Sequence, residues 1–150
     1  MISLLRTNST NSDFIQLVVA LDADLKIRDG EDHAFYAQYN GINDIRYVVV
    51  AYENEEALGC GAIKQYDNGI MEIKRMFVTP GSRGKGIASM ILKELERWAL
   101  ELGFDRCILE TGINQHEAIG LYQENGYSRM PNYGQYAEVC TSFCFEKVIC

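Results

Sequence analysis

The sequence has few prolines and no long apolar run, and each shortage excludes a class of protein. Its 150 residues include two prolines, Pro80 and Pro131, and no Pro- or Ser-rich linker, so we expect a single domain over residues 1–150. No stretch approaches the ~18 to 20 apolar residues that cross a bilayer. The first residues lack the basic region and apolar core of a secretory leader. We therefore expect a cytoplasmic protein with no membrane partner.

Positive charge is scarce as well. Lysine and arginine total 14 against 21 aspartates and glutamates, a net charge of −7, which argues against a nucleic-acid partner because phosphate backbones are bound by basic surfaces. The five cysteines are odd in number and lie mostly in apolar runs, as reduced thiols packed like small hydrophobic residues do. Cys140 and Cys144 are spaced as metal ligands can be, but no second pair or close histidine accompanies them, so we expect no metal.

The most informative segment is residues 77–88, in which a strand ends, a glycine-rich basic turn follows and an amphipathic helix begins. Such a turn directs main-chain N–H groups toward one small volume at the positive end of the helix dipole. Glycines let the backbone approach a ligand closely, and Arg83 and Lys85 add positive charge that packing does not require. The segment therefore predicts a site for the diphosphate of a cofactor.

Hydrophobic periodicity and turn residues predict the rest of the fold. We expect strands over residues 2–6, 46–52, 57–66, 70–78, 106–110, 127–130 and 138–148, and helices over residues 13–27, 31–39, 86–102 and from Asn114 to a stop at Gly126, with Glu117 completing a capping box. Residues 46–78 should form an antiparallel meander, and the helix after it should lead to a parallel strand. The fold class is α+β, a mixed sheet of about seven strands with helices on both faces.

Two motifs in order resemble the GNAT acetyltransferase superfamily over nearly the whole chain. The first is Arg83-x-x-Gly86-x-Ala88 after the strand that ends Met76-Phe77-Val78. The second comprises Leu109-Glu110-Thr111-Gly112, Asn114, Ala118-Ile119 and Leu121-Tyr122-x-x-x-Gly126-Tyr127. They lie ~25 to 30 residues apart, as a crossover unit allows. The resemblance implies a GNAT fold and acetyl-CoA as co-substrate.

The resemblance also implies where the co-substrate binds, in a wedge between strands 70–78 and 106–111. It assigns the cofactor contacts to Met76, Phe77, Val78, Arg83, Gly84, Lys85, Gly86, Ile87, Ala88 and Asn114. The pantetheine amides should extend the first strand, and the main-chain N–H of Phe77 or Val78 should polarise the thioester carbonyl. For Asn114, helix capping is an equally good explanation.

Candidate catalytic residues follow from the same resemblance. Tyr122 is expected to protonate the departing thiolate, since a phenol near ~10 and a thiol near ~8.5 are close in pKa; a core aromatic is the alternative. Glu72 is the leading base for the substrate ammonium, and simple alternation groups it with Lys74, Met76 and Val78. It could instead be a solvated residue paired with Lys74. Glu110 is its rival, and ordered water is a third possibility.

The acceptor side is less defined. Tyr133 and Tyr136, in the loop 131–136, offer rigid rings and hydroxyls that could form a lid over a cationic amine, or could simply pack. Neither His33 nor His116 is assigned a catalytic role. The predicted function is N-acetyl transfer from acetyl-CoA to a primary amine, small or peptidic, by direct attack in a ternary complex. A non-catalytic acyl-CoA sensor is the alternative, and sheet edges make a homodimer conceivable.

Overall fold

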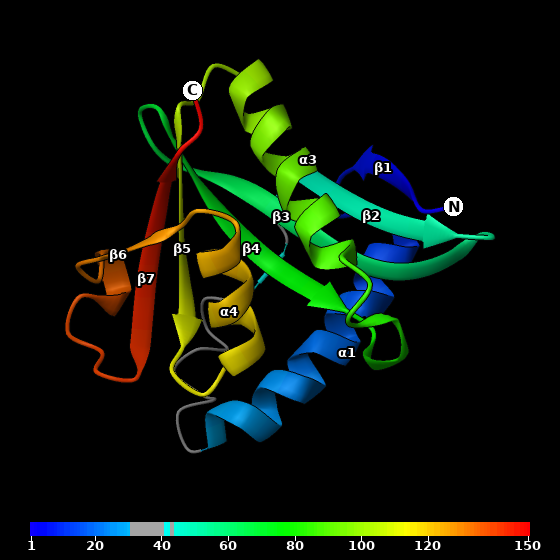
Figure 1. Ribbon diagram of the computed structural model, residues 1–150, viewed down its shortest axis with the longest axis horizontal. Helices are drawn as coiled ribbons and strands as arrows, with labels where there is room; N and C mark the ends of the chain where they lie inside the picture. The colour runs from blue at the N-terminus through cyan, green and yellow to red at the C-terminus, as the bar shows by residue number, and fades with distance from the viewer. Residues whose placement is uncertain (31–40, 43) are drawn as a thin grey trace.

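A seven-stranded mixed sheet organises the part of the chain that the computed structural model describes, residues 1–30, 41, 42 and 44–150 (Figure 1). The strand order is β1-β2-β3-β4-β5-β7-β6. The strands are β1 (Ser3–Thr7), β2 (Tyr47–Glu53), β3 (Glu56–Asp67), β4 (Ile70–Val78), β5 (Arg106–Gly112), β6 (Ser128–Met130) and β7 (Ser142–Val148); the α-helices are α1 (Ser12–Asp29), α3 (Ile87–Glu101) and α4 (His116–Glu124); the 3₁₀ turns are η2 (Pro80–Ser82) and η3 (Gly134–Tyr136).

Helices cover both faces of the sheet, which confirms the predicted α+β class. α3 buries Ile87, Ile91 and Leu95 in a core on one face, and α4 adds Tyr122 to the same core. α1 buries Phe14 on the opposite face, in a second core that includes alternate residues of β2 and β3. In Figure 1, α3 crosses in front of β2 and β3, and the first turns of α1 are seen behind them. The two-sided core reflects the period-2 alternation of the strands.

Two of the predicted helices differ from the described structure or lie outside it. The helix expected at residues 31–39 lies outside the described residues, as does His33. α4 begins at His116 rather than Asn114, and its N-cap is Gln115, without a side-chain cap bond, so the predicted capping box is wrong. The amide of Asn114 instead donates to the carbonyl of Arg28 at 3.3 Å. The Glu117 carboxylate accepts from the Arg28 guanidinium, because the end of α1 lies beside the start of α4.

β4 and β5 are parallel neighbours for three residue pairs only, from Ile70 with Arg106 to Glu72 with Ile108. Beyond Glu72 the strands separate, while β5 stays paired with β7 along its whole length. Figure 1 shows the ends of β4 and β5 pointing apart, with α4 beside the gap. The expected wedge is therefore confirmed, and the facing edges of both strands are left without a ladder partner there.

A bulge in β4 changes which side chains share a face. Cys60 pairs with Phe77 but Ala62 pairs with Lys74, so β4 has one more residue than β3 between these pairs. Arg75 lies in the bulge with φ of 57°, a conformation that few residues other than glycine adopt. Phe77 therefore packs on the α1 face, whereas Met76 and Val78 pack on the α3 face. The predicted grouping of Glu72 with Met76 and Val78 is wrong, because strict alternation ends at the bulge.

The cysteines yield a test of this packing. Cys60, Cys107 and Cys144 are buried, whereas Cys140 and Cys150 are exposed. Burial raises the pKa of Cys60 and Cys107 to about 12 and that of Cys144 to about 11, and the thiolate is the reactive form. We expect iodoacetamide at pH 8 to label two thiols in the native protein and five in urea, measured by intact mass. Labelling of a third thiol without unfolding would contradict the packing.

Candidate active site

The glycine-rich turn presents free main-chain donors at the start of α3. Gly84 and Gly86 have φ of 79° and 78°, the left-handed conformation that glycine adopts without strain. The first intrahelical bond runs from the Met90 N–H to the Gly86 carbonyl at 3.1 Å. The N–H groups of residues 87–89 therefore have no acceptor within the helix. Three such donors at the positive end of a 15-residue helix are an arrangement that suits an anion.

A cavity of about 530 Å³, called here the larger cavity, lies between this turn, the end of β4, α4 and the second half of α1. The predicted cofactor residues that line it are Met76, Phe77, Val78, Arg83, Gly84, Gly86, Ile87 and Ala88. Lys85 is exposed and does not line it, and neither does Asn114. Sequence reasoning missed Ser82, Ser89 and Arg28, which also line it. Arg28 gave no local signal, because it reaches the cavity from α1.

Hydrogen bonding at the end of β4 shows which main-chain groups face the gap. The Thr79 N–H donates to the Leu58 carbonyl of the neighbouring strand at 2.9 Å. Since successive residues of a strand point their N–H and C=O groups to opposite sides, Phe77 bonds toward β3 and Val78 toward the gap. Arg83 Nε donates to the Val78 carbonyl at 2.9 Å, as this direction requires. Of the two predicted donors, the geometry favours Val78.

A second cavity of about 120 Å³, the smaller cavity, adjoins the first. Both are lined by Leu21, Met76, Gln115, Ala118 and Tyr122, so they meet where β4 and β5 separate. The smaller cavity is also lined by charged and polar side chains of both strands, among them Glu72, Lys74, Arg75 and Glu110. The two adjoining cavities therefore run from polar side chains of β4 and β5 at one end to the N-terminus of α3 at the other.

Tyr122 lies at the junction of the two cavities. Its side chain is 5% exposed, and edge contacts with Tyr127 and a tilted contact with Phe145 hold the ring. Burial, with a smaller contribution from the Glu110 carboxylate, raises the pKa of Tyr122. The phenol therefore keeps its proton throughout the neutral range, and its pKa lies further from that of a thiol than the sequence suggested. Tyr122 is therefore a packed core aromatic, as the alternative expected, and it also lines both cavities.

The two candidate bases, Glu72 and Glu110, are brought to one cavity. Glu72 is 7% exposed; it accepts a 2.6 Å hydrogen bond from the Tyr133 hydroxyl and lies 3.7 Å from the Lys74 ammonium. Glu110 accepts from the Ser142 hydroxyl at 2.6 Å. Glu72 is thus paired with Lys74, as one alternative expected, but it is buried at the cavity and not solvated on a surface. The structure keeps both carboxylates as candidates.

Tyr133 and Tyr136 do not stand over an opening. They are 9% and 3% exposed, their rings contact one another, and Tyr133 packs edge-on against Tyr66. Tyr136 lines the smaller cavity, whereas Tyr133 does not and instead orients Glu72. Of the two alternatives for these tyrosines, a lid or simple packing, the observed contacts correspond to packing.

The GNAT acetyltransferase family model matches residues 15–127 of this chain. The chain belongs to this family. An IAA acetyltransferase of Azospirillum brasilense is 32% identical over 150 residues, 97% of each chain. The uncharacterized N-acetyltransferase YjgM of Escherichia coli is 37% identical over 97 residues, 63% of this chain and 56% of the other. The GNAT assignment makes the protein an acyltransferase enzyme.

Solved GNAT structures agree with the fold. A Klebsiella pneumoniae protein, provisionally named an acyl-CoA N-acyltransferase, superposes with a TM-score of 0.84 at 30% identity and covers 100% of this chain and 99% of its own. The PaiA N-acetyltransferase of Thermoplasma acidophilum, solved with coenzyme A, has a TM-score of 0.73 at 17% identity and 99% coverage of both chains. At that identity the likeness shows the fold alone. Among the described residues, no helix is long and apolar enough to cross a membrane.

Proposed function

We propose that this GNAT protein transfers the acetyl group of acetyl-CoA to a primary amine by direct attack in a ternary complex. The observation that carries the proposal is the meeting of the two cavities in the gap between β4 and β5, with Tyr122 at their junction. Two substrates can then be held at once with their reacting atoms adjacent. No cysteine of the described chain lines either cavity, which supports direct attack over an acyl-cysteine route.

The residues present fit acetyl-CoA, which supplies the acetyl group as a thioester. The free N–H groups of residues 87–89 and the charge of Arg83 suit its diphosphate. The open edge of β4 suits its pantetheine amides, which pair as an added strand does. Arg83 Nε donates to the Val78 carbonyl. For a pantetheine amide to pair with that carbonyl, the Arg83 side chain must break this hydrogen bond and bind the ligand instead.

Different side chains at the junction of the two cavities then accept and donate the protons of the reaction. Glu72, Glu110 or a water held by them accepts a proton from the acceptor ammonium, and the neutral nitrogen forms the C–N bond. The Val78 N–H polarises the carbonyl. As the C–S bond breaks, the Tyr122 hydroxyl donates its proton to the departing sulfur, and the second proton that the nitrogen loses as the amide forms restores the Tyr122 phenol. The overall products are the N-acetylated amine and the free thiol of the carrier.

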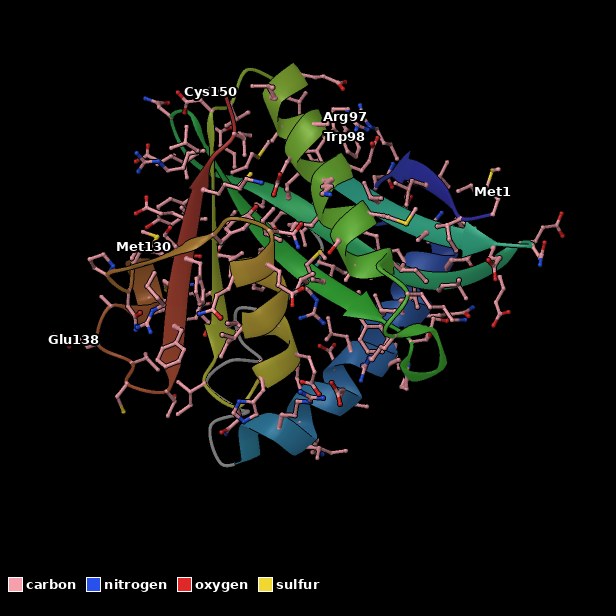
Figure 2. The ribbon with its side chains drawn as sticks, in the orientation of Figure 1. Met1, Arg97, Trp98, Met130, Glu138 and Cys150 are labelled. Carbon is pink, nitrogen blue, oxygen red and sulfur yellow. The ribbon has the colours of Figure 1, made fainter. Side chains whose placement is uncertain are left out.

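We expect Arg83→Ala to weaken acetyl-CoA binding about tenfold, the effect of one lost charge-assisted contact. Isothermal titration calorimetry measures the affinity directly. The matched control is Arg97→Ala. Arg97 is labelled on α3 in Figure 2; its side chain is 65% exposed and donates to Glu94. The variant should bind acetyl-CoA as the wild type does. Equal affinity in Arg83→Ala and wild type would remove the diphosphate site from the proposal.

Catalysis itself is tested by the release of free coenzyme A thiol in the presence of acetyl-CoA and a panel of primary amines. At least one amine should raise thiol release well above the rate of hydrolysis without acceptor. Binding of acetyl-CoA in calorimetry without release by any amine in the panel would contradict N-acetyl transfer.

A further inference from the structure

Two residues that line the smaller cavity, Arg75 and Gln115, each carry a buried donor atom that has no acceptor among the described residues. Arg75 is 6% exposed, and its terminal nitrogen pairs with Asp22, yet its Nε has no hydrogen-bond partner among the described residues. The Nε2 of Gln115 is likewise buried and without a partner in the described part of the chain. Both residues line the smaller cavity. Buried donors are nearly always satisfied in folded proteins, so two exceptions at one cavity point to a ligand with acceptor oxygens.

The same cavity carries charge of both signs. Glu72 and Glu110 contribute carboxylates, and in each of them one oxygen is held by a hydroxyl, from Tyr133 or Ser142. Lys74 and Arg75, adjacent on β4, contribute positive charge. The carboxylates suit the ammonium of an acceptor. Because the two carboxylates are balanced by the two cations among the charged residues that line the cavity, the cavity offers no net attraction to the several positive charges of a polyamine.

We propose, on the basis of the proposed N-acetyltransferase function, that the acceptor is a small amino acid-like zwitterion. Its ammonium lies at Glu72 and Glu110, and its carboxylate takes the donors of Arg75 and Gln115. A lysine side chain of a protein has no such carboxylate and leaves both donors unsatisfied. The volume of about 120 Å³ suits a small molecule, and Leu21 and Leu25 line it with apolar surface for a short side chain.

The first test compares acceptors that differ only in the carboxylate. Each protein amino acid is assayed for thiol release beside its amide and its decarboxylated amine, with spermidine and a lysine peptide included. The best amino acid should exceed its own amide and amine at least tenfold in kcat/KM. Equal or better use of the amide, the amine, spermidine or the peptide overturns the zwitterion while N-acetyl transfer stands. No release with any acceptor contradicts the proposed function as well.

The second test uses Gln115→Glu, which places a negative charge where the acceptor carboxylate binds. We expect kcat/KM for the amino acid to fall at least tenfold and that for its amide to change less than threefold. Acetyl-CoA affinity is measured in parallel by calorimetry, a necessary control because Gln115 also lines the larger cavity. Gln123→Glu makes the same change at an exposed position of α4. It should change kcat/KM neither for the amino acid nor for its amide.

A third variant, Arg75→Lys, keeps the charge but removes Nε. It should raise KM for the amino acid more than KM for the amide. The proposed position of the acceptor carboxylate is wrong if Gln115→Glu lowers kcat/KM for the amino acid and for its amide by the same factor. It is also wrong if the variant weakens acetyl-CoA binding by that factor. Gln115 lies at the N-cap of α4, where an acidic residue is compatible with the helix dipole, so its variant should fold even if Arg75→Lys does not.

Discussion

Tyr122→Phe should lower kcat at least 100-fold and leave acetyl-CoA affinity within twofold of wild type, since general acid catalysis contributes typically ~10² to 10⁴ in rate. Phenylalanine keeps the ring that packs against Tyr127 and Phe145. The change therefore removes a proton donor at the cavity junction and little else.

The matched control is Tyr127→Phe. The Tyr127 hydroxyl donates to Glu96 at 2.8 Å and does not line either cavity. Losing this bond should cost about 1 kcal/mol of stability and lower Tm by ~2 to 4 °C, with kcat unchanged. Tyr122→Phe should show the reverse, a large loss of kcat at nearly wild-type Tm. Full turnover in Tyr122→Phe would end its role as the acid.

The pH dependence gives Tyr122 a second signature. Burial raises its pKa above the ordinary value for tyrosine, so the protonated, donating form persists to higher pH than in a free phenol. We therefore expect no loss of wild-type kcat with an apparent pKa near 10, the value for an unperturbed tyrosine. The measurement is the kcat profile at saturating substrates.

The sequence pattern predicted the parts of the site that depend on the backbone conformation of a few neighbouring residues. The glycines of the turn, the end of β4 and the start of α3 carry their own backbone requirements, and β4 was predicted at its observed bounds. The separation of β4 from β5 was predicted from the family resemblance instead, because the residue pattern of neither strand indicates where hydrogen bonding between them ends.

The face of Glu72 shows why pattern alone was insufficient. Alternation assumes an unbroken register, but Arg75 takes a left-handed conformation and adds a residue to β4 opposite Gly61. Gly61 permits this arrangement, because a Cβ there would overlap the Met76 sulfur and lie 2.9 Å from Leu95. A strand's own sequence does not reveal which residue will occupy a bulge. The partner of Glu72 was also hidden, since Tyr133 is 61 positions away and reaches it through a loop.

Glu72→Gln should lower kcat about 100-fold if Glu72 is the general base. Glutamine is nearly the same size and retains an oxygen for the Tyr133 hydroxyl, so the wall of the smaller cavity is preserved while the proton acceptor is lost. Acetyl-CoA affinity should be unchanged, because Glu72 does not line the larger cavity. Steady-state rates at saturating amine and calorimetry with acetyl-CoA measure the two quantities separately.

Glu110→Gln is the matched control, because it makes the same change on the opposite wall. A larger loss of kcat in Glu110→Gln than in Glu72→Gln would identify Glu110 as the general base. Losses below about tenfold in both single variants would assign proton removal to water. The double variant then decides whether the carboxylates cooperate: losses that multiply indicate independent roles, whereas a double variant no worse than Glu72→Gln places both on one proton path. Because the two side chains lie on strands that part just beyond Glu72, such a path would cross the gap in which the amine must attack.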